Sequence, residues 1–444
     1  MTTRVLSDRL ALFPAGSSVS AENHLVVGGC DAAELAREFG TPLYLFDEQT
    51  LRGQCRSFLH EFGSRYPHTR VLYAAKAFLN LALARLVHQE GLGMDVVSGG
   101  ELAIAAAAEF PMERVYFHGN NKTPEELSYA LEMHVGRVVI DNFHEIALLE
   151  RLASQAGQEM AVLLRVGPGV DAHTHTYTTT GILDTKFGLP IATGQAEEAV
   201  RQVMAASHLR LVGLHMHLGS PIFELEPYRL GLGAVLPFVA QMAERYDLKL
   251  QELSPGGGFA VQYLLDRPAP PIADYASAMV GELRRQLEAS GLGEPLLVLE
   301  PGRAIVGRAG VALYSVGSRK TVPGVREYVS VDGGMGDNIR PALYEAGYEA
   351  LLANQVESDI TERVTLAGKY CESGDVLVRD VDLPPLQPGD VVAIPAAGAY
   401  CLAMASNYNA SLRPAVILVG EGGARLIRRR ETFEDLLRCD VPLP

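Results

Sequence analysis

Eight short apolar runs, each followed by a segment with helical character, constrain most strongly how this chain folds. The runs are Val71–Lys76, Met94–Ser98, Val115–Gly119, Arg137–Asp141, Ala161–Val166, Leu211–His217, Leu248–Ser254 and Leu296–Pro301. Strands that are apolar throughout and alternate with helices indicate a parallel sheet covered on both faces. Eight such units over about 250 residues predict a (β/α)8 TIM-like barrel. An open, doubly wound sheet is the alternative, but the first run lacks the G-x-G-x-x-G turn that would favour it.

The pattern changes after about residue 310 to short β-like runs separated by turn clusters. These runs are Val311–Val316, Glu327–Val331, Val376–Val378, Val391–Ile394 and Ala415–Val419. This pattern is typical of an all-β domain. We therefore predict three segments: residues 1–46, whose short strands and loops join the β domain, residues 47–310, which form the barrel, and residues 311–444, which form the C-terminal β domain.

Charge and cysteine content limit the partners and the compartment. Lysine and arginine total 38 against 53 aspartates and glutamates, a formal net charge of −15, which argues against nucleic acid and anionic membranes as partners. Five widely spaced cysteines without a C-x-x-C pair fit neither a disulfide framework nor a zinc site and favour the cytoplasm. No stretch approaches the ~18 apolar residues of a membrane span, and the N-terminus lacks the apolar run of a signal peptide.

The C-terminal ends of barrel strands build the active site in folds of this kind, and here those ends carry reactive or glycine-rich groups. In chain order they are Lys76, His217, Ser220, Gly257, Gly258, Glu300, Gly302 and Arg303. A lysine in a desolvated pocket can bond covalently to an aldehyde cofactor. A carboxylate such as Glu300 can hold a protonated pyridine nitrogen. Successive glycines leave backbone N–H groups open to a phosphate, and Arg303 could contact the phosphate or a substrate carboxylate.

Each of these residues also has an ordinary structural explanation. Lys76 could be a snorkelling side chain or half of an ion pair, Glu300 could pair with an arginine, and His217 could be a satisfied core histidine. His215 and His217 together resemble a zinc motif, since residues i and i+2 of a strand share a face. No further ligand is evident nearby, so we predict no metal site. His173 and His175 are predicted to be loop residues for the same reason.

Ten blocks in register, from about Thr41 to the C-terminal SNYNASLRP, resemble the fold-type III pyridoxal-phosphate decarboxylases. The blocks are AAKA, DVVSGGEL, FHGNNKT, TGILDTKFG, GLHMHLGS, GGGF, EPGR, DGGMGDNIRPALY, GKYCESGD and GAYCLAMASNYN. This family includes diaminopimelate and ornithine decarboxylases and, more distantly, alanine racemase. CESGD and RPALY look specifically like the diaminopimelate decarboxylases. Pro221 and Thr185 depart from the family pattern, which usually has glutamine and serine there.

The resemblance implies an alanine-racemase-like fold and a role for each site residue. Lys76 would carry pyridoxal 5'-phosphate covalently, and the residues expected around the cofactor are His217, Ser220, Gly257, Gly258, Glu300, Gly302, Arg303 and Tyr400. The residues expected to bind substrate are Arg303, Arg340, Tyr344, Glu372 and Tyr400. Cys371 would supply a catalytic proton from a loop of the partner subunit, which implies a head-to-tail homodimer with shared active sites. Cys401 is expected to be a buried structural thiol.

The resemblance also implies the reaction. A carboxy-lyase of this kind would convert meso-2,6-diaminopimelate to L-lysine and CO2, the last step of lysine biosynthesis. Arg303 and Arg340 can bind the distal carboxylate of this substrate, and Glu372 can bind its ammonium group. A related enzyme for another diamine-type amino acid, such as D-ornithine or D-lysine, is the closest alternative. A non-catalytic homologue is the other, but it would be expected to lack Lys76 or Cys371.

Overall fold

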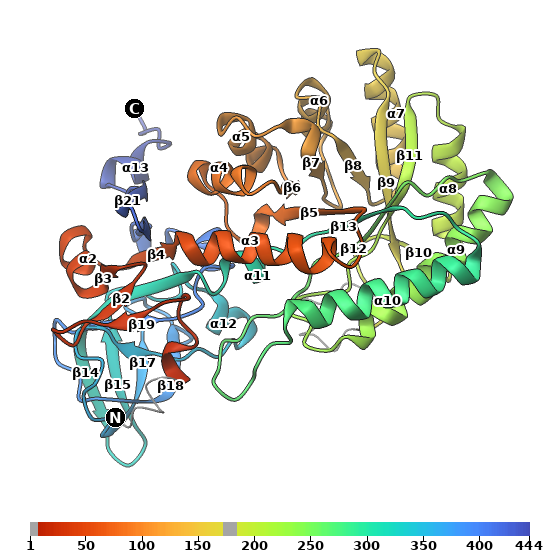
Figure 1. Cartoon of the computed structure of the whole chain (residues 1–444). Helices are drawn as coiled ribbons and strands as arrows, with labels where there is room; N and C mark the ends of the chain where they lie inside the picture. The colour runs from red at the N-terminus through yellow and green to blue at the C-terminus, as the bar shows by residue number, and fades with distance from the viewer. Residues whose placement is uncertain (1–7, 172–183) are drawn as a thin grey trace. The chain divides into compact units, whose positions relative to one another are not determined.

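The computed structural model describes residues 8–171 and 184–444 (Figure 1), so His173 and His175 lie outside the described residues. The chain divides into two compact units. The barrel unit comprises Gln54–Ala260 and Ala269–Gly302, and the β unit comprises Met1–Gly53, Val261–Pro268 and Arg303–Pro444. The domain boundaries after residues 46 and 310 stay predictions.

Parallel strands close into a ring in the described part of the barrel unit. Around the ring the order is β5, β6, β7, β8, β9, β11, β12 and β13, and the last pairs with the first. The strands are β5 Thr69–Ala74, β6 Gly93–Val96, β7 Val115–Phe117, β8 Arg137–Ile140, β9 Met160–Gly167, β11 Leu209–His215, β12 Glu252–Gly256 and β13 Leu296–Leu299, and short β10 Leu189–Pro190 pairs with β9 alone. The predicted (β/α)8 barrel is confirmed.

Helices follow most of the strands and lie outside the ring (Figure 1). They are α3 Glu48–Gly63, α4 Leu81–Gln89, α5 Gly99–Ala107, α6 Pro124–Glu132, α7 Phe143–Ala156, α8 Gln195–Ala205, α9 Glu226–Tyr246 and α10 Ile272–Ser290, with short 3-10 turns η1 Ala75–Ala77 and η2 Met112–Arg114. Helix α6 begins with a capping box, because Thr123 Oγ1 accepts the N–H of Glu126 and the Glu126 carboxylate accepts the N–H of Thr123. Such caps fix the residue at which a helix begins after the preceding strand.

Each predicted barrel strand differs from the observed one at one end or at both, and two of these differences bear on the site and on the helix caps. Strand β5 ends at Ala74, and Lys76 lies in the 3-10 turn η1 that follows it. The seventh strand is Glu252–Gly256, four residues later than the predicted start at Leu248. Leu248 is buried, but its N–H bonds back to the carbonyl of Met242, and Asp247 takes a left-handed conformation (φ 57°) that ends helix α9. Leu248 is therefore part of a helix cap and not of a strand.

The β unit is organised around a sheet with the strand order β18-β17-β15-β14-β4-β20-β21, and β19 pairs with β14 and β16. The strands are β4 Leu43–Asp47, β14 Gly310–Val322, β15 Arg326–Val331, β16 Leu351–Leu352, β17 Glu362–Ala367, β18 Val376–Leu383, β19 Val391–Ile394, β20 Ala415–Gly420 and β21 Gly423–Arg428. A separate small sheet joins β1 Ser18–Val19, β2 Leu25–Val27 and β3 Cys30–Asp31. Strand β4 pairs antiparallel with β14 and parallel with β20, so the N-terminal part of the chain supplies an inner strand of the C-terminal sheet.

Short helices complete the β unit. They are α2 Ala32–Phe39, α11 Arg303–Val306, α12 Arg340–Tyr344 and α13 Phe433–Leu437, with 3-10 turns η3 Leu402–Met404 and η4 Tyr408–Ala410. Residues of β2, α2, β4, β14, β19 and β20 share one buried apolar cluster. Among the described residues, no helix is both long and apolar enough to cross a membrane.

Candidate active site

The candidate residues of the barrel unit all lie at or just beyond the C-terminal ends of its strands. Lys76 follows β5, His217 and Ser220 follow β11, Gly257 and Gly258 follow β12, and Glu300 and Gly302 follow β13. The structure thus gathers them at the end of the barrel where enzymes of this fold do their chemistry. The Lys76 side chain is exposed in the single chain.

The glycine run after β12 permits close backbone approaches that no other residue would allow. A Cβ atom on Gly257 would lie 2.1 Å from the carbonyl oxygen of Glu300, and one on Gly258 would lie 2.5 Å from that of Gly219. Gly258 also has φ +100°, a region that L side chains rarely adopt. The N–H of Gly257 points at Nδ1 of His217, 3.3 Å away. Neutral His217 therefore carries its proton on Nε2.

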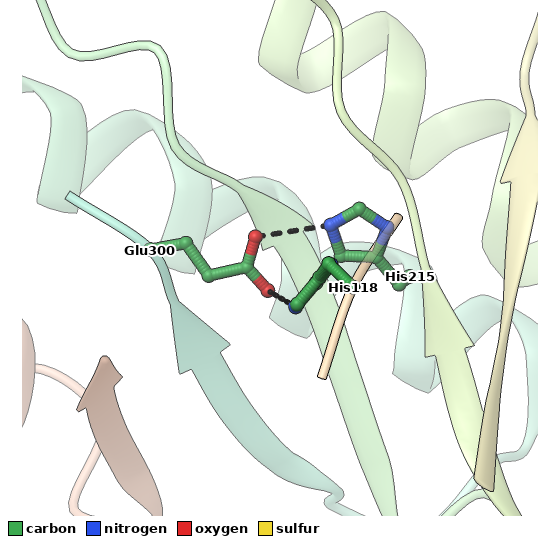
Figure 2. Close-up of side chains that lie close together, drawn as sticks. All are labelled: His118, His215 and Glu300. Atoms are coloured by element: carbon green, nitrogen blue, oxygen red, sulfur yellow. Dashed lines mark hydrogen bonds and ion pairs between the residues drawn. The ribbon is translucent and has the colours of Figure 1, made fainter. Parts of the chain in front are cut away.

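Glu300 lies among polar side chains from three other barrel strands. Its Oε1 accepts the hydroxyl of Ser254 at 2.7 Å, and its Oε2 lies 3.0 Å from Nε2 of His215. Nε2 of His118 lies 3.5 Å from Oε1, and Figure 2 shows the two histidines meeting different oxygens of the carboxylate. Burial alone would raise the pKa of Glu300, but His215, His118 and the hydrogen bonds from His215 and Ser254 hold it well below its usual value. Glu300 is therefore a buried anion.

Asp95, the third residue of β6, adds a second carboxyl group to the barrel mouth. Burial raises the pKa of Asp95 to about 8, partly opposed by the positive charge of Lys76 and reinforced by Glu300. Asp95 is thus protonated at neutral pH in the cofactor-free chain. Two neighbouring carboxyl groups are held in different protonation states, an arrangement that is common where acid and base groups work together.

Sequence reasoning missed three charged or polar residues of this site. They are His118, Asp95 and Arg165, whose guanidinium lies 3.9 Å from Asp141 and over the ring of Phe187. His118 stands in the FHGNNKT block near the C-terminal end of the third predicted strand, and this position was the signal that could have identified it. Asp95 begins the DVVSGGEL block within the second predicted strand, where the one acidic residue of an apolar run was the signal.

We predicted no metal site because no further ligand was evident near His215 and His217, and that reason was incomplete. The structure brings His118, His215 and Glu300 together with ligand atoms all within 4.8 Å of one another. His217 is not part of this group and lies beyond the end of β11. Glu300 is already hydrogen-bonded to His215 and Ser254, and these contacts explain why the three side chains lie close together without a metal ion.

A second cluster of candidate residues lies in the β unit and combines two arginines with three tyrosines. Arg303 donates to the hydroxyl of Tyr263 at 2.8 Å and lies over the ring of Tyr400 at 4.7 Å. The Arg340 guanidinium lies over the rings of Tyr263 at 4.5 Å and Tyr348 at 5.3 Å and donates to the Tyr348 hydroxyl. Tyr263 and Tyr348 were not predicted, because they belong to no recognised block.

Arg340 is buried without an acidic partner. Its side chain is only 5% exposed, and its Nε has no hydrogen-bond partner among the described residues. Burial alone would lower its pKa, but the nearby hydroxyls of Tyr263 and Tyr348 and the thiol of Cys401 favour the charged form and raise the pKa above its usual value. No carboxylate of the described residues forms an ion pair with Arg340. Buried cations are normally paired, so this guanidinium is suited to bind an anionic ligand group.

Tyr400 and Cys401 extend this cluster. Tyr400 has φ +60°, an uncommon backbone conformation for a bulky residue that often occurs where function over-determines local geometry. Cys401 is fully buried, and its Sγ lies 3.5 Å from the Tyr348 hydroxyl and 3.3 Å from Oδ1 of Asn338. The expectation that Cys401 is buried is therefore confirmed, whereas its structural role stays a prediction. Tyr344 is half-buried, and its hydroxyl lies 4.0 Å from Sδ of Met404.

Cys371 and Glu372 are both exposed on a loop of the β unit. Buried Asp375 organises this loop, because its carboxylate accepts the N–H groups of Tyr370 at 2.9 Å and Met335 at 2.6 Å. The N–H of Cys371 donates to Oδ1 of Asn409 at 3.1 Å. The thiol is thus presented on an ordered, accessible loop, as a reactive cysteine requires.

The residues of the barrel unit fit pyridoxal 5'-phosphate. The glycine run is a cradle that side chains would fill, the buried Glu300 is an anion suited to a protonated ring nitrogen, and Lys76 stands beside acidic Asp95. Buried polar atoms without a hydrogen-bond partner among the described residues, Nε2 of His118 and Oδ1 of Asp95, are also found there. Such atoms mark a site built for a polar group that the chain itself does not supply.

Comparisons with known proteins agree with this class of enzyme. Residues 48–307 match the family described as "Pyridoxal-dependent decarboxylase, pyridoxal binding domain", and the barrel fold and its site define the same class. A diaminopimelate decarboxylase of Bacillus subtilis (strain 168) is 46% identical over 426 residues, covering 96% of this chain and 97% of the relative. One from Mycobacterium tuberculosis (strain ATCC 25618 / H37Rv) is 44% identical over 439 residues, covering 97% and 98%. The chain therefore belongs to the diaminopimelate decarboxylase family.

Solved structures support the same assignment. The crystal structure of diaminopimelate decarboxylase from M. jannaschii in complex with L-lysine has a TM-score of 0.91 and 35% identity, and the match covers 96% of this chain and 98% of that one. A lysine/ornithine decarboxylase from Vibrio vulnificus has a TM-score of 0.74 at 23% identity, covering 90% and 99%. That second similarity is one of fold alone. The predicted fold class, barrel plus β domain of the alanine-racemase type, is confirmed.

Proposed function

We propose that this chain is a pyridoxal 5'-phosphate-dependent carboxy-lyase that converts meso-2,6-diaminopimelate to L-lysine and CO2, the last step of lysine biosynthesis. The observation that carries the proposal is the buried, anionic Glu300 at the end of barrel strand β13, held by Ser254 and His215. Diaminopimelate decarboxylases at 42–46% identity over nearly the full length support the substrate.

The cofactor would be held by residues at the barrel mouth and in the neighbouring segments of the chain. Lys76 would carry it covalently, Glu300 would accept a hydrogen bond from its ring nitrogen, and His217 would stack on the ring. The backbone N–H groups near Gly257, Gly258 and Gly302, with Ser220, Arg303 and Tyr400, would bind the phosphate. When bound, the cofactor supplies an electron sink for the electron pair that remains when CO2 leaves.

The protein's own groups then manage protons and orientation. Glu300 keeps a proton on the nitrogen that faces it, because an anion fixed by Ser254 and His215 is a strong acceptor. Cys371 lies on an exposed, ordered loop, and we propose that its Sγ delivers a proton to the substrate α-carbon after CO2 has left.

Substrate choice rests on the far end of the substrate. Arg340, buried without a carboxylate partner, would bind the distal carboxylate, with Arg303, Tyr344 and Tyr400 contributing to the same subsite. Glu372 would bind the distal ammonium group. Ornithine and lysine lack the distal carboxylate, which would leave buried donors unpaired at ~1–3 kcal/mol each. The arrangement therefore favours diaminopimelate over either diamino acid.

We further propose a head-to-tail homodimer in which the loop of Cys371 completes the site of the partner subunit. Cys371 and Glu372 are exposed in the single chain, which leaves them open to such an arrangement. We also propose that the protein works in the cytoplasm, because all five cysteines are free thiols and would be at risk of pairing in an oxidising compartment. No nucleic acid or membrane partner is proposed for a chain with a net charge of −15.

An activity panel tests the function directly. Purified protein loaded with pyridoxal 5'-phosphate is incubated with meso-diaminopimelate, L-ornithine, D-ornithine, L-lysine and D-lysine, and released CO2 is measured. We expect release from diaminopimelate alone, and borohydride reduction should leave the cofactor attached to Lys76. Lys76→Ala should lose both activity and cofactor absorbance, whereas Lys249→Ala, at an exposed ion pair, should keep them. Equal turnover of any diamino acid would contradict the substrate assignment and favour the related-decarboxylase alternative.

A further inference from the structure

The buried carboxylate of Glu300 contacts side chains from three other barrel strands. His118 follows β7, His215 ends β11 and Ser254 lies in β12, whereas Glu300 itself follows β13. The side chains of His118, His215 and Glu300 are 6%, 2% and 5% exposed. Side chains that follow or belong to three other strands therefore converge on the two oxygens of one buried carboxylate.

The two imidazoles are held at fixed orientations. Their ring centroids lie 4.8 Å apart with an interplanar angle of 74°, an edge-to-face arrangement. The backbone N–H of His118 donates to the carbonyl of Val96 at 2.8 Å, which anchors it between β6 and β7. Figure 2 shows that each ring presents a nitrogen to a different carboxylate oxygen. Because an ionised carboxylate can only accept, the nitrogens that face it are expected to carry the protons.

His118 is expected to be neutral, and because its Nε2 makes no hydrogen bond among the described residues, its effect on Glu300 is electrostatic. Burial lowers its pKa well below the usual value, and the charges of His215, Lys76 and Arg165 act in the same direction, partly opposed by Glu300. Its Nε2 lies 3.5 Å from Glu300 Oε1 and 3.7 Å from Asp95 Oδ1. The titratable and charged groups that bear on Glu300 are thus His118, His215, Asp95, Lys76, Arg165 and His217.

We propose that His118 and His215 are positioning residues. They contact Glu300 from two sides, keep its carboxylate ionised and orient it toward the ring nitrogen of the cofactor. This inference rests on the proposed function and deepens it. It gives a role to two histidines that the proposed function does not assign to substrate or cofactor. A carboxylate oriented by fixed N–H donors loses little freedom when its ligand arrives, and that pre-organisation strengthens binding.

The variants that test this are His118→Ala and His118→Gln, with His144→Ala as a matched control at an exposed helical site. A change of one unit in the pKa of Glu300 corresponds to about a tenfold change in an equilibrium constant. We expect His118→Ala to weaken cofactor binding to cofactor-free protein by at least about tenfold. His118→Gln, which keeps an N–H donor, should recover part of that loss, and His144→Ala should match wild type.

Two measurements separate positioning from simple loss of structure. The pH below which cofactor affinity falls should move upward by roughly one pH unit in His118→Ala, since Glu300 loses a nearby imidazole whose electrostatic effect favours its anion. In cofactor-free protein labelled with 15N-histidine, His215 should show a protonated Nε2 in wild type, and its resonance should shift in Glu300→Gln. If His118→Ala fails to fold, the same measurements on His118→Gln decide the question.

Three outcomes would overturn the inference. The first is a folded His118 variant whose cofactor affinity, and the pH dependence of that affinity, match wild type. The second is a His215 that carries its proton on Nδ1. The third is a stoichiometric metal ion bound by His118, His215 and Glu300. The first two outcomes are compatible with full activity on diaminopimelate, so the inference could fail while the proposed function stands. A bound metal ion would contradict the role of Glu300 in both. Conversely, wild-type protein that binds no cofactor or releases no CO2 from diaminopimelate would refute the proposed function.

Discussion

At the scale of single residues, the most informative one is Arg340, a buried cation surrounded by tyrosines and without an acidic partner. Arg340→Ala should lower kcat/KM for diaminopimelate by roughly thirtyfold or more, because removing one partner of a buried charge-assisted contact commonly costs ~2–5 kcal/mol. Cofactor absorbance should stay near wild type, since no phosphate or ring contact is assigned to this residue. Steady-state kinetics with Arg379→Ala, an exposed arginine in the same unit, provide the control. An unchanged kcat/KM would contradict the carboxylate assignment.

Asp95 allows a prediction of pH dependence at the same scale. Its pKa is about 8 in the folded cofactor-free chain and about 3.9 when unfolded, so the folded state binds an extra proton between these values. Its contribution to stability is present below the unfolded pKa and is lost as pH rises through the folded pKa. Asp95→Asn should therefore gain thermal stability over wild type progressively from pH 5 to pH 8.5, by several degrees if the effect is a few kcal/mol.

The measurement is the unfolding temperature of cofactor-free protein between pH 5 and pH 9. Asp247→Asn, which changes an exposed aspartate, should give a curve parallel to wild type. Parallel curves for Asp95→Asn as well would show that the buried carboxyl group is ionised at neutral pH.

At the scale of elements, the glycine run after β12 links fold to cofactor site. Gly258→Ala introduces a Cβ 2.5 Å from the Gly219 carbonyl oxygen at a residue with φ +100°. Both the loop after β11 and the glycine run would have to move, so we expect a loss of stability of about 1–3 kcal/mol and weaker cofactor binding. Denaturant unfolding and cofactor titration measure the two effects.

A second glycine in the same unit provides the opposite expectation. Gly281 lies in helix α10 on an exposed face, and a Cβ there would meet no atom within 4 Å. Gly281→Ala should stabilise the protein by up to ~1 kcal/mol, because alanine has the higher helix propensity. Equal stability changes for Gly258→Ala and Gly281→Ala would show that the glycine run is not constrained by its neighbours.

At the scale of the whole molecule, the shared-site homodimer makes a prediction that no single chain can satisfy. Lys76→Ala and Cys371→Ala proteins should each be inactive, yet mixing them should restore part of the activity through heterodimers with one intact site. The two residues lie in different units of the chain, and each variant keeps the residue that the other lacks. Activity is measured after subunit exchange has been verified with differently tagged chains. No recovery despite verified exchange would mean that each chain forms its site alone.

The sequence by itself determined the architecture and most of the candidate residues. Barrel strands buried on both faces are mostly apolar, and this local property is visible without the fold. Strand ends such as Glu300 and the glycine run could be predicted because a parallel barrel always gathers its C-terminal strand ends. The exposed loop of Cys371 followed from its polar neighbours Glu372, Ser373 and Asp375.

Only the tertiary structure decided which of these groups meet. His118, His215 and Glu300 come from strands far apart in the sequence, and ring closure and register, which no local pattern encodes, bring their side chains into contact. Burial and the neighbouring groups then give the two carboxyl groups different protonation states, so that Glu300 is anionic and Asp95 is protonated. The turn that carries Lys76 past the end of β5 and the pairing of β4 with β14 likewise depend on packing between distant segments. Local periodicity reports how a segment is buried, whereas contacts between segments depend on how the whole chain closes.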